Sequence, residues 1–515
     1  MQSVGLVGAD EPRYAQVARE MMQRHDWVTP TLWGKPWLEK PPLFYWFTVA
    51  AYRAAGGVHD WAARLPSVAL TTVMIFFIYF WTRRFFRGMQ LDAALITAAS
   101  AMIIGFSRSA STDIPLTATF TMAMLCWYAW CLQRGRAWLL AFYFLLALGA
   151  LAKGPVAAFL ALAVIVLFVA LRRDWKLLLR TLWPPGILLF LVVALPWYIA
   201  VQRANPDFFR VFILQHNLAR YTSDLYRHPE PFWYFLAIAL AGLVPWTVFV
   251  VCALIDAIRD WRYSVEQPAG QEDLRTFLTI WFLFPVFFFS FSHSKLAGYI
   301  LPSIPAATIL LADYIRRRDA EGDRPPLWQI LLHGAVSAAL LITAFIVPFR
   351  LLHLPLPKAT LAVAALLAVC ALAMFTATLL TNGYRVLRIT TLVPVIIAFA
   401  LALRGTAPII DALQSARTVQ ARLQLTALGQ IPDIAVYDVP RGIEYGLGFY
   451  RNHPVADYGW GEIPDATHIL VAKAGTQKEL QDRLGQRRVT RLDGWGLPDR
   501  PLYDFYLVAA KHTGP

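Results

Sequence analysis

Ionisable side chains gather at the ends of apolar segments of this chain, where they could act on one substrate. The set contains carboxylates, cations, one histidine and one tyrosine: Asp10, Glu11, Glu39, Asp113, Lys40, Lys153, Arg220, Lys295, His216 and Tyr299. Ionisable groups near a bilayer cost several kcal/mol unless they are paired or hydrated, so such residues are candidates for a functional site.

This combination suits the transfer of a group from a phosphate leaving group. Ammonium and guanidinium groups stabilise the charge that builds on the departing phosphate. A carboxylate can deprotonate or orient the attacking acceptor. The sequence contains neither a P-loop nor a G-x-G-x-x-G after a strand, and nucleotide phosphates are not expected outside the cell. We therefore expect the phosphate to be attached to a lipid.

Each residue also has a purely structural explanation. Asp10 and Asp113 could cap the helices that they precede, and Lys153 could extend its ammonium group to the interface. A single His216 is more often a packed interfacial histidine than a ligand. The convergence of several carboxylates and cations beside one leaflet is what favours a functional site.

The composition requires a membrane. Of the 515 residues, 58% are hydrophobic and 16% charged, and the mean hydropathy is +0.49, against roughly 45–50% apolar and about 25% charged in soluble domains. These values exclude an ordinary soluble enzyme, a disordered chain and a nucleic-acid binder that depends on the net charge of +14. The four cysteines lie in apolar runs, so we expect neither a disulfide framework nor structural zinc: Cys126, Cys131, Cys252 and Cys370.

Apolar stretches long enough to cross a hydrocarbon core of about 30 Å predict twelve transmembrane spans. They lie at about 65–84, 90–108, 112–132, 138–152, 155–172, 181–202, 232–255, 276–292, 297–315, 328–348, 358–381 and 388–403. Alternate loops are rich in Arg and Lys, which predicts that these loops face the cytoplasm and that the ionisable set faces outward.

The chain divides into three parts in this interpretation. Residues 1–64 form an external loop with juxtamembrane helices, one amphipathic near residues 14–22 and one apolar at 42–57. Residues 65–404 form the transmembrane domain. Residues 405–515 form a soluble C-terminal domain, because strand-like 433–439, 468–472 and 502–509 alternate with helical 441–451 and 477–486. The expected fold class is an all-α polytopic membrane protein with a small C-terminal α/β domain.

An ordered series of motifs resembles the bacterial aminoarabinose transferases, which belong to the protein O-mannosyltransferase superfamily with the GT-C fold. The motifs are Asp10-Glu11-Pro12-Arg13-Tyr14-Ala15, Glu39-Lys40-Pro41-Pro42-Leu43, Ala63-Arg64-Leu65-Pro66, Thr112-Asp113-Ile114-Pro115, Ala152-Lys153-Gly154-Pro155, the His216–Arg220 loop, and Ser294-Lys295-Leu296 with Tyr299-Ile300-Leu301-Pro302. The resemblance covers residues 8–405 and implies a transmembrane helix before Asp10, which we expect to be encoded upstream of Met1.

The resemblance implies an integral inner-membrane glycosyltransferase with its active site and C-terminal domain facing the periplasm. Asp10 would be the central catalytic carboxylate and Asp113 a second one near the acceptor. Lys153 and Arg220 would hold the phosphate of the carrier, helped by three further residues: Lys40, Lys295 and Tyr299. Glu39 and His216 match positions that hold a metal in a relative, although one histidine and one carboxylate are too few ligands to predict zinc.

The expected donor is a sugar on polyprenyl (undecaprenyl) phosphate, and the expected acceptor is lipid A or another envelope glycan. The partners are thus these two lipids and the phospholipid bilayer, with no nucleic acid. Two alternatives stay open: protein O-mannosylation, and a transporter or flippase for a lipid-linked sugar, which would need sites reachable from both sides of the membrane.

Overall fold

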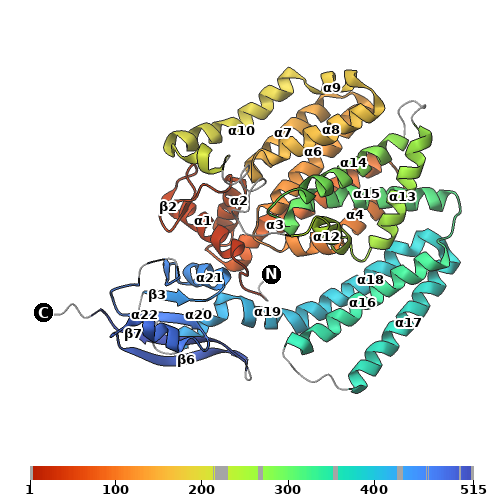
Figure 1. Cartoon of the computed structure of the whole chain (residues 1–515). Coiled ribbons are helices and arrows are strands. Elements are labelled where there is room, and N and C mark those ends of the chain that lie inside the picture. Colours follow the sequence, from red (N-terminus) through yellow and green to blue (C-terminus); the bar gives the residue numbers. More distant parts are fainter. Residues whose placement is uncertain are drawn as a thin grey trace.

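The computed structural model describes residues 4–212, 214, 230–264, 271–351, 358–425, 433–459, 461, 463–497 and 500–511. Figure 1 shows a bundle of long helices with a small sheet domain beside it. The N-terminal helices lie between the bundle and the sheet domain. This arrangement confirms the predicted fold class, an all-α membrane bundle with a small C-terminal α/β domain.

The bundle consists, in chain order, of α-helices, the short 3-10 helices η2 and η3, and the short π-helix η4. They are α3 (Asp60–Phe85), α4 (Gln90–Ala98), α5 (Ala101–Ser107), α6 (Asp113–Gln133), α7 (Arg136–Lys153), α8 (Val156–Arg172), α9 (Trp175–Thr181), α10 (Pro184–Ala204), α12 (Tyr234–Gly242), α13 (Thr247–Ser264), α14 (Gln271–Ser290), η2 (Ala297–Ser303), α15 (Ile304–Ala320), α16 (Leu327–Leu351), α17 (Lys358–Asn382), η3 (Gly383–Val386), α18 (Leu387–Leu401), η4 (Ala402–Thr406) and α19 (Ala407–Gln414).

Several of these helices are long and apolar enough to cross a bilayer. In the part of the chain that the structure describes, eight helices meet this requirement alone, and two bent pairs raise the number to ten. The pair α4 and α5 bends by 62°, and the pair α12 and α13 by 114°. Helix α8 is apolar but shorter than these. The chain is a multi-pass membrane protein, and the predicted number of twelve spans is not confirmed.

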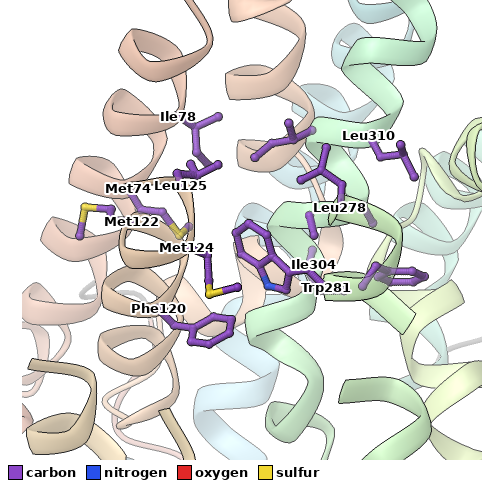
Figure 2. Packing of buried hydrophobic residues seen from close by; sticks show 14 of the residues in the cluster. Met74, Ile78, Phe120, Met122, Met124, Leu125, Leu278, Trp281, Ile304 and Leu310 are labelled. Carbon is purple, nitrogen blue, oxygen red and sulfur yellow. The ribbon is translucent and has the colours of Figure 1, made fainter. Parts of the chain in front are cut away.

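The bundle has a core of aromatic and aliphatic side chains. Trp281 of α14 is fully buried, and its indole nitrogen donates a hydrogen bond to the carbonyl oxygen of Pro302 at 2.9 Å. Figure 2 shows the Trp281 ring between Phe120 and Met124 of α6 and Ile304 of α15. The Phe120 and Trp281 ring centroids are 5.8 Å apart with the rings nearly perpendicular, a favourable geometry for aromatic pairs. These contacts join the helices that carry Asp113 and Tyr299.

The N-terminal segment covers one end of the bundle. It contains α1 (Asp10–Arg24), the hairpin of β1 (Thr31–Leu32) and β2 (Lys35–Pro36), and α2 (Leu43–Ala54). Both predicted juxtamembrane helices therefore form. Glu20 of α1 is buried and fastens the hairpin, accepting hydrogen bonds from Thr31 Oγ1 at 2.8 Å, Trp33 N at 2.7 Å and Gly34 N at 3.1 Å. The hairpin leads directly into Glu39 and Lys40.

The C-terminal domain is a five-stranded mixed sheet with flanking helices. Its strand order is β4-β3-β5-β7-β6, with β3 parallel to β4 and β5, and β7 antiparallel to β5 and β6. The elements are α20 (Ala416–Leu425), β3 (Ile434–Tyr437), α21 (Arg441–Arg451), β4 (Val455–Asp457), β5 (His468–Lys473), α22 (Gln477–Leu484), β6 (Val489–Leu497) and β7 (Arg500–Val508). The sequence pattern does not predict β4 or β6.

Helix α1 packs against protein on its polar side as well as its apolar side. Arg19 Nη1 donates hydrogen bonds to the Phe449 carbonyl oxygen at 2.7 Å and to Asn452 Oδ1 at 3.1 Å, both in the C-terminal domain. The amphipathic pattern predicted a helix on the membrane surface. The structure instead covers its polar face with α21, a long-range contact that the local pattern does not report.

Replacing Glu20 with alanine should loosen the hairpin, because three donors would lose their acceptor and each unsatisfied buried group costs about 1–3 kcal/mol. We expect amide hydrogen exchange at residues 31–36 to rise about tenfold or more. The exposed Glu479→Ala exchange on α22 is the control. Unchanged protection in Glu20→Ala would show that Glu20 does not hold the hairpin.

Candidate functional site

Asp113 and Lys153 form an ion pair at one end of the bundle. Asp113 is the first residue of α6 and Lys153 the last of α7. Because α6 and α7 are antiparallel neighbours joined by a short turn, the start of one meets the end of the other. Each charge also suits its place on the helix, since a carboxylate is favoured at a helix N-terminus and a cation at a C-terminus. The side chains are 17% and 15% exposed, so a ligand can still reach them.

Tyr299 lies against the same ion pair. The Lys153 Nζ atom is 5.4 Å from the centre of the Tyr299 ring, a distance at which the ring attracts the cation. The preceding Gly298 packs directly on Asp113, since a Cβ atom there would lie 2.6 Å from Asp113 Oδ1. Glycine at this position leaves room for the carboxylate. The structure thus brings together three predicted site residues from α6, α7 and η2.

Lys295 is close to Tyr299 in the chain but bonds to the backbone. Its Nζ donates to the carbonyl oxygens of Ser292 at 2.7 Å and Glu230 at 2.9 Å. Lys295 therefore joins the segment before η2 to Glu230, which lies shortly before α12. His216 and Arg220, which the sequence analysis placed in the site, lie outside the described residues.

Glu11 connects the N-terminal helix to the start of α6. Its carboxylate is buried and accepts two hydrogen bonds from Arg64 of α3, one of them from Nε at 3.0 Å. The same carboxylate accepts from the backbone nitrogen of Ala110 at 2.8 Å. Ala110 precedes Asp113 by three residues, and Asp10 precedes Glu11 by one. Glu11 therefore holds both predicted catalytic carboxylates at the same end of the bundle.

Asp10 is paired with Arg13, one turn further along α1. Asp10 is 53% exposed, whereas Arg13 is 12% exposed. The guanidinium carbon of Arg13 lies 4.7 Å from the ring centre of Trp37 and 5.5 Å from that of Tyr445 in the C-terminal domain. Two aromatic rings from distant segments therefore hold the cation that faces Asp10.

The Glu39-Lys40 pair lies between the part of the site around Asp10 and the part around Asp113. Burial raises the pKa of Tyr14 well above its ordinary value, and the negative charges of Asp10 and Glu39 raise it further. The charge of Glu39 therefore acts on the same residue, Tyr14, as the charge of Asp10. Lys40 lies near the part of the site around Asp113, because its positive charge stabilises the Asp113 carboxylate. Neighbouring residues of one segment therefore place one charge near each part of the site.

Within the described ranges, no group of three or more His, Cys, Asp or Glu side chains is arranged to hold a metal ion. Glu39 is described, but its predicted partner His216 is not. A metal at this position stays a prediction from the resemblance.

Basic residues mark the opposite end of the same helices. Helix α3 begins at Asp60 and carries Arg83 and Arg84 in its last turn, and Arg84 donates a hydrogen bond to Gln133 at the end of α6. Helix α8 begins beside Lys153 and ends with Arg172. The Arg-rich ends and the candidate site therefore lie at opposite ends of the bundle, as the loop charges predict.

Several residues that contact the predicted site residues are not themselves predicted from the sequence. Arg13 lies within a predicted motif without a predicted role, and Gly298, Trp37 and Tyr445 are not predicted to take part. The role of Arg13 could have been predicted, because a cation one turn after a carboxylate in a helix predicts an ion pair. The other contacts join residues that lie in different elements, from Trp37 in the turn region after α1 to Tyr445 in the C-terminal domain, and local spacing does not reveal them.

The chain is similar to known transferases that are named after a sugar carried on a lipid phosphate. A profile of the family described as dolichyl-phosphate-mannose-protein mannosyltransferase matches residues 39–199. The chain is 30% identical over 349 residues to the undecaprenyl phosphate-alpha-4-amino-4-deoxy-L-arabinose arabinosyl transferase of Edwardsiella ictaluri, covering 65% of this chain and 61% of that protein. It is 32% identical over 314 residues to the protein of the same name from Yersinia enterocolitica, covering 59% and 54%. The matches therefore span about three fifths or less of these relatives.

The fold matches a solved structure along its whole length. The crystal structure of ArnT from Cupriavidus metallidurans bound to undecaprenyl phosphate superposes with a TM-score of 0.77 at 24% identity, covering 100% of this chain and 96% of that chain. At this identity the likeness shows a shared fold. Together the comparisons confirm the resemblance to aminoarabinose transferases found in the motifs.

Glu444 of α21 should titrate near neutral pH. Burial raises its pKa to about 7, and the charge of Asp457 adds to the increase. Its contribution to stability is fully present below the ordinary value of 4.5 and is lost as the pH rises through about 7. We expect Glu444→Gln to gain apparent unfolding temperature over the parent at pH 8 and to gain little at pH 5. The exposed Asp482→Asn exchange is the control, and an equal difference at both pH values would contradict this prediction.

Proposed function

We propose that this protein is an integral membrane glycosyltransferase that takes a sugar from a polyprenyl phosphate carrier, undecaprenyl phosphate in bacteria, and transfers it to lipid A or another envelope glycan. The observation that carries the proposal is the ion pair of Asp113 and Lys153 at one end of an apolar bundle, where Glu11 also links the start of α1, with Asp10, to the segment before α6. The relatives named as arabinosyl transferases support the same class of reaction.

The cations supply the phosphate-binding half of the proposed site. Lys153 is held between Asp113 and the Tyr299 ring, so its ammonium group is already positioned when the donor arrives. When the bond between the sugar and the phosphate breaks, negative charge builds on the phosphate oxygens, and a fixed ammonium group stabilises that charge. Lys40 adds a second positive charge near Asp113. Arg220 completes this set in the proposal.

The carboxylates supply the acceptor half. The acceptor oxygen attacks the anomeric carbon, the bond from that carbon to the phosphate oxygen breaks, and the electron pair leaves with the phosphate. Direct displacement inverts the anomeric centre. A hydroxyl acceptor needs a base to take its proton, and the exposed carboxylate of Asp10 is suited to that role. A lipid A phosphate is already ionised and needs only to be oriented.

The geometry also favours an enzyme over a transporter. A transporter needs its site to open alternately to both sides of the membrane, whereas the described part of this site lies at one end of the bundle. With the Arg-rich ends in the cytoplasm, the site and residues 405–515 face the periplasm of the bacterial inner membrane in this proposal. Residues 1–64 and 65–404 then form the external loop and the transmembrane domain.

Replacing Lys153 with glutamine should slow transfer about 100- to 1000-fold, the usual cost of removing one stabiliser of transition-state charge. Arg136→Gln, at the other end of the same helix, is the matched control and should keep the parental rate. Purified variants would be compared by single-turnover transfer from a radiolabelled undecaprenyl phosphate sugar. A folded Lys153→Gln protein with the parental rate would contradict the assignment of Lys153 to the donor phosphate.

Deleting the gene should remove one sugar from lipid A, which mass spectrometry of extracted lipid A would detect as the loss of a single glycosyl mass. Complementation with the parent should restore it, and complementation with Asp113→Asn should not. Loss of hexose from exported proteins with unchanged lipid A would instead identify a protein O-mannosyltransferase. Accumulation of the lipid-linked sugar on the cytoplasmic face would identify a flippase.

A further inference from the structure

An apolar crevice lies on the side of the bundle, away from the candidate site. Four helices form it, and its volume is about 190 Å³. Its walls come from the middle of α7 and α8, from α9 and from the start of α10, with Tyr143, Ala161, Leu178 and Ile187 among the lining residues. The crevice therefore extends from α9 toward the middle of the bundle.

The polar atoms beside this crevice already have partners. The Tyr143 hydroxyl donates to the Thr181 carbonyl oxygen at 2.5 Å, and the Trp127 indole nitrogen donates to Thr181 Oγ1 at 3.1 Å. Thr181 Oγ1 donates in turn to the Leu177 carbonyl oxygen at 2.9 Å. An apolar cavity of comparable size stays dry and accepts hydrocarbon ligands. The apolar lining of this crevice favours an alkyl chain over water or a polar molecule.

The backbone of α10 comes close to α7 beside the crevice. A Cβ atom at Gly186 would lie 2.2 Å from a carbon of the Tyr143 ring. The absence of that side chain lets the start of α10 pack on the ring, which forms one wall of the crevice. The walls are therefore fixed by packing.

The mouth of the crevice has the residues of a membrane interface. Helix α9 exposes Trp175 and Leu179, at 55% and 70% of their surface, and Leu182 follows directly. Tryptophan and leucine beside basic residues are typical of a helix that lies at the headgroup boundary. Three cations on or beside α9 are exposed, Arg173, Lys176 and Arg180, and Arg180 directly precedes Thr181 of the crevice lining. Asp174, the one acidic residue in this stretch, caps α9 by accepting a hydrogen bond from Leu177 N.

The mouth of the crevice is far from Lys153. Helix α8 has 17 residues and runs from Val156, beside Lys153, to Arg172, beside α9, a length of about 25 Å. The cations at α9 therefore lie in the opposite leaflet from the Asp113 and Lys153 pair. A lipid bound at α9 is distinct from a donor lipid whose phosphate is held by Lys153.

We propose that this crevice binds an anionic phospholipid of the Arg-rich leaflet. One acyl chain fills the apolar space between α7, α8 and α10, and the headgroup phosphate lies against Lys176 and Arg180. Apolar walls select an alkyl chain, and the exposed cations select a negatively charged headgroup. The site does not depend on the proposed transfer reaction.

Native mass spectrometry of the purified full chain tests the proposal by titration with phosphatidylglycerol, phosphatidylcholine and undecaprenyl phosphate. Removing both cations, Lys176→Gln with Arg180→Gln, should weaken phosphatidylglycerol binding about 10- to 30-fold and leave phosphatidylcholine unchanged. The matched control, Arg83→Gln with Arg87→Gln, removes two exposed cations from the same end of the bundle and should change neither affinity.

Filling the crevice with Ala161→Leu should weaken both phospholipids about tenfold or more, because the acyl chain loses its space. Ala158→Leu, on the same wall, gives the same test if Ala161→Leu does not fold. Equal phosphatidylglycerol binding by the parent and a folded crevice-filling variant would overturn the proposal. A crevice-filling variant that loses undecaprenyl phosphate binding but retains phosphatidylglycerol binding would also overturn the proposal. That result would assign the crevice to the donor lipid.

Discussion

The buried ion pair between Glu11 and Arg64 is the constraint on which the candidate site depends. Two charges taken from water cost several kcal/mol each unless their remaining hydrogen bonds are satisfied. Here they are satisfied, because Glu11 also accepts from Ala110 N, and Arg64 also donates to the carbonyl oxygens of Val4 and Gly5. The pair joins α1, α3 and the segment before α6, so the positions of Asp10 and Asp113 are linked through Glu11.

The remaining charges follow the ends of the helices. An apolar bundle can hold ionisable groups where helices end, since the helix termini supply opposite partial charges and water reaches that level. Asp113 and Lys153 pair with each other. A donor phosphate then meets a cation that is already fixed in place, which lowers the cost of ordering the site during the reaction.

Much of this arrangement follows from the sequence, but only where the signal is local. Long apolar runs predict the bundle, and the alternation of apolar and polar residues predicts β3, β5 and β7. The Arg and Lys residues of alternate loops predict that the site lies opposite the Arg-rich ends. The 114° bend between α12 and α13 has no comparable signal, and short strands such as β4 fall below the length at which alternation is visible. The packing of Tyr445 on Arg13 joins residues more than 400 positions apart, and only the folded chain reveals such a contact.

The central claim is that Glu11 and Arg64 place the two carboxylates for transfer without themselves binding the donor. A double variant, Glu11→Met with Arg64→Met, tests it most directly, because replacing both buried charges with apolar side chains preserves folding in many proteins while Ala110 N loses its acceptor. The single-turnover transfer rate should fall about 100-fold, the usual effect of a displacement near 1 Å, while affinity for undecaprenyl phosphate stays within about threefold of the parent. A folded double variant that transfers sugar at the parental rate would contradict the account.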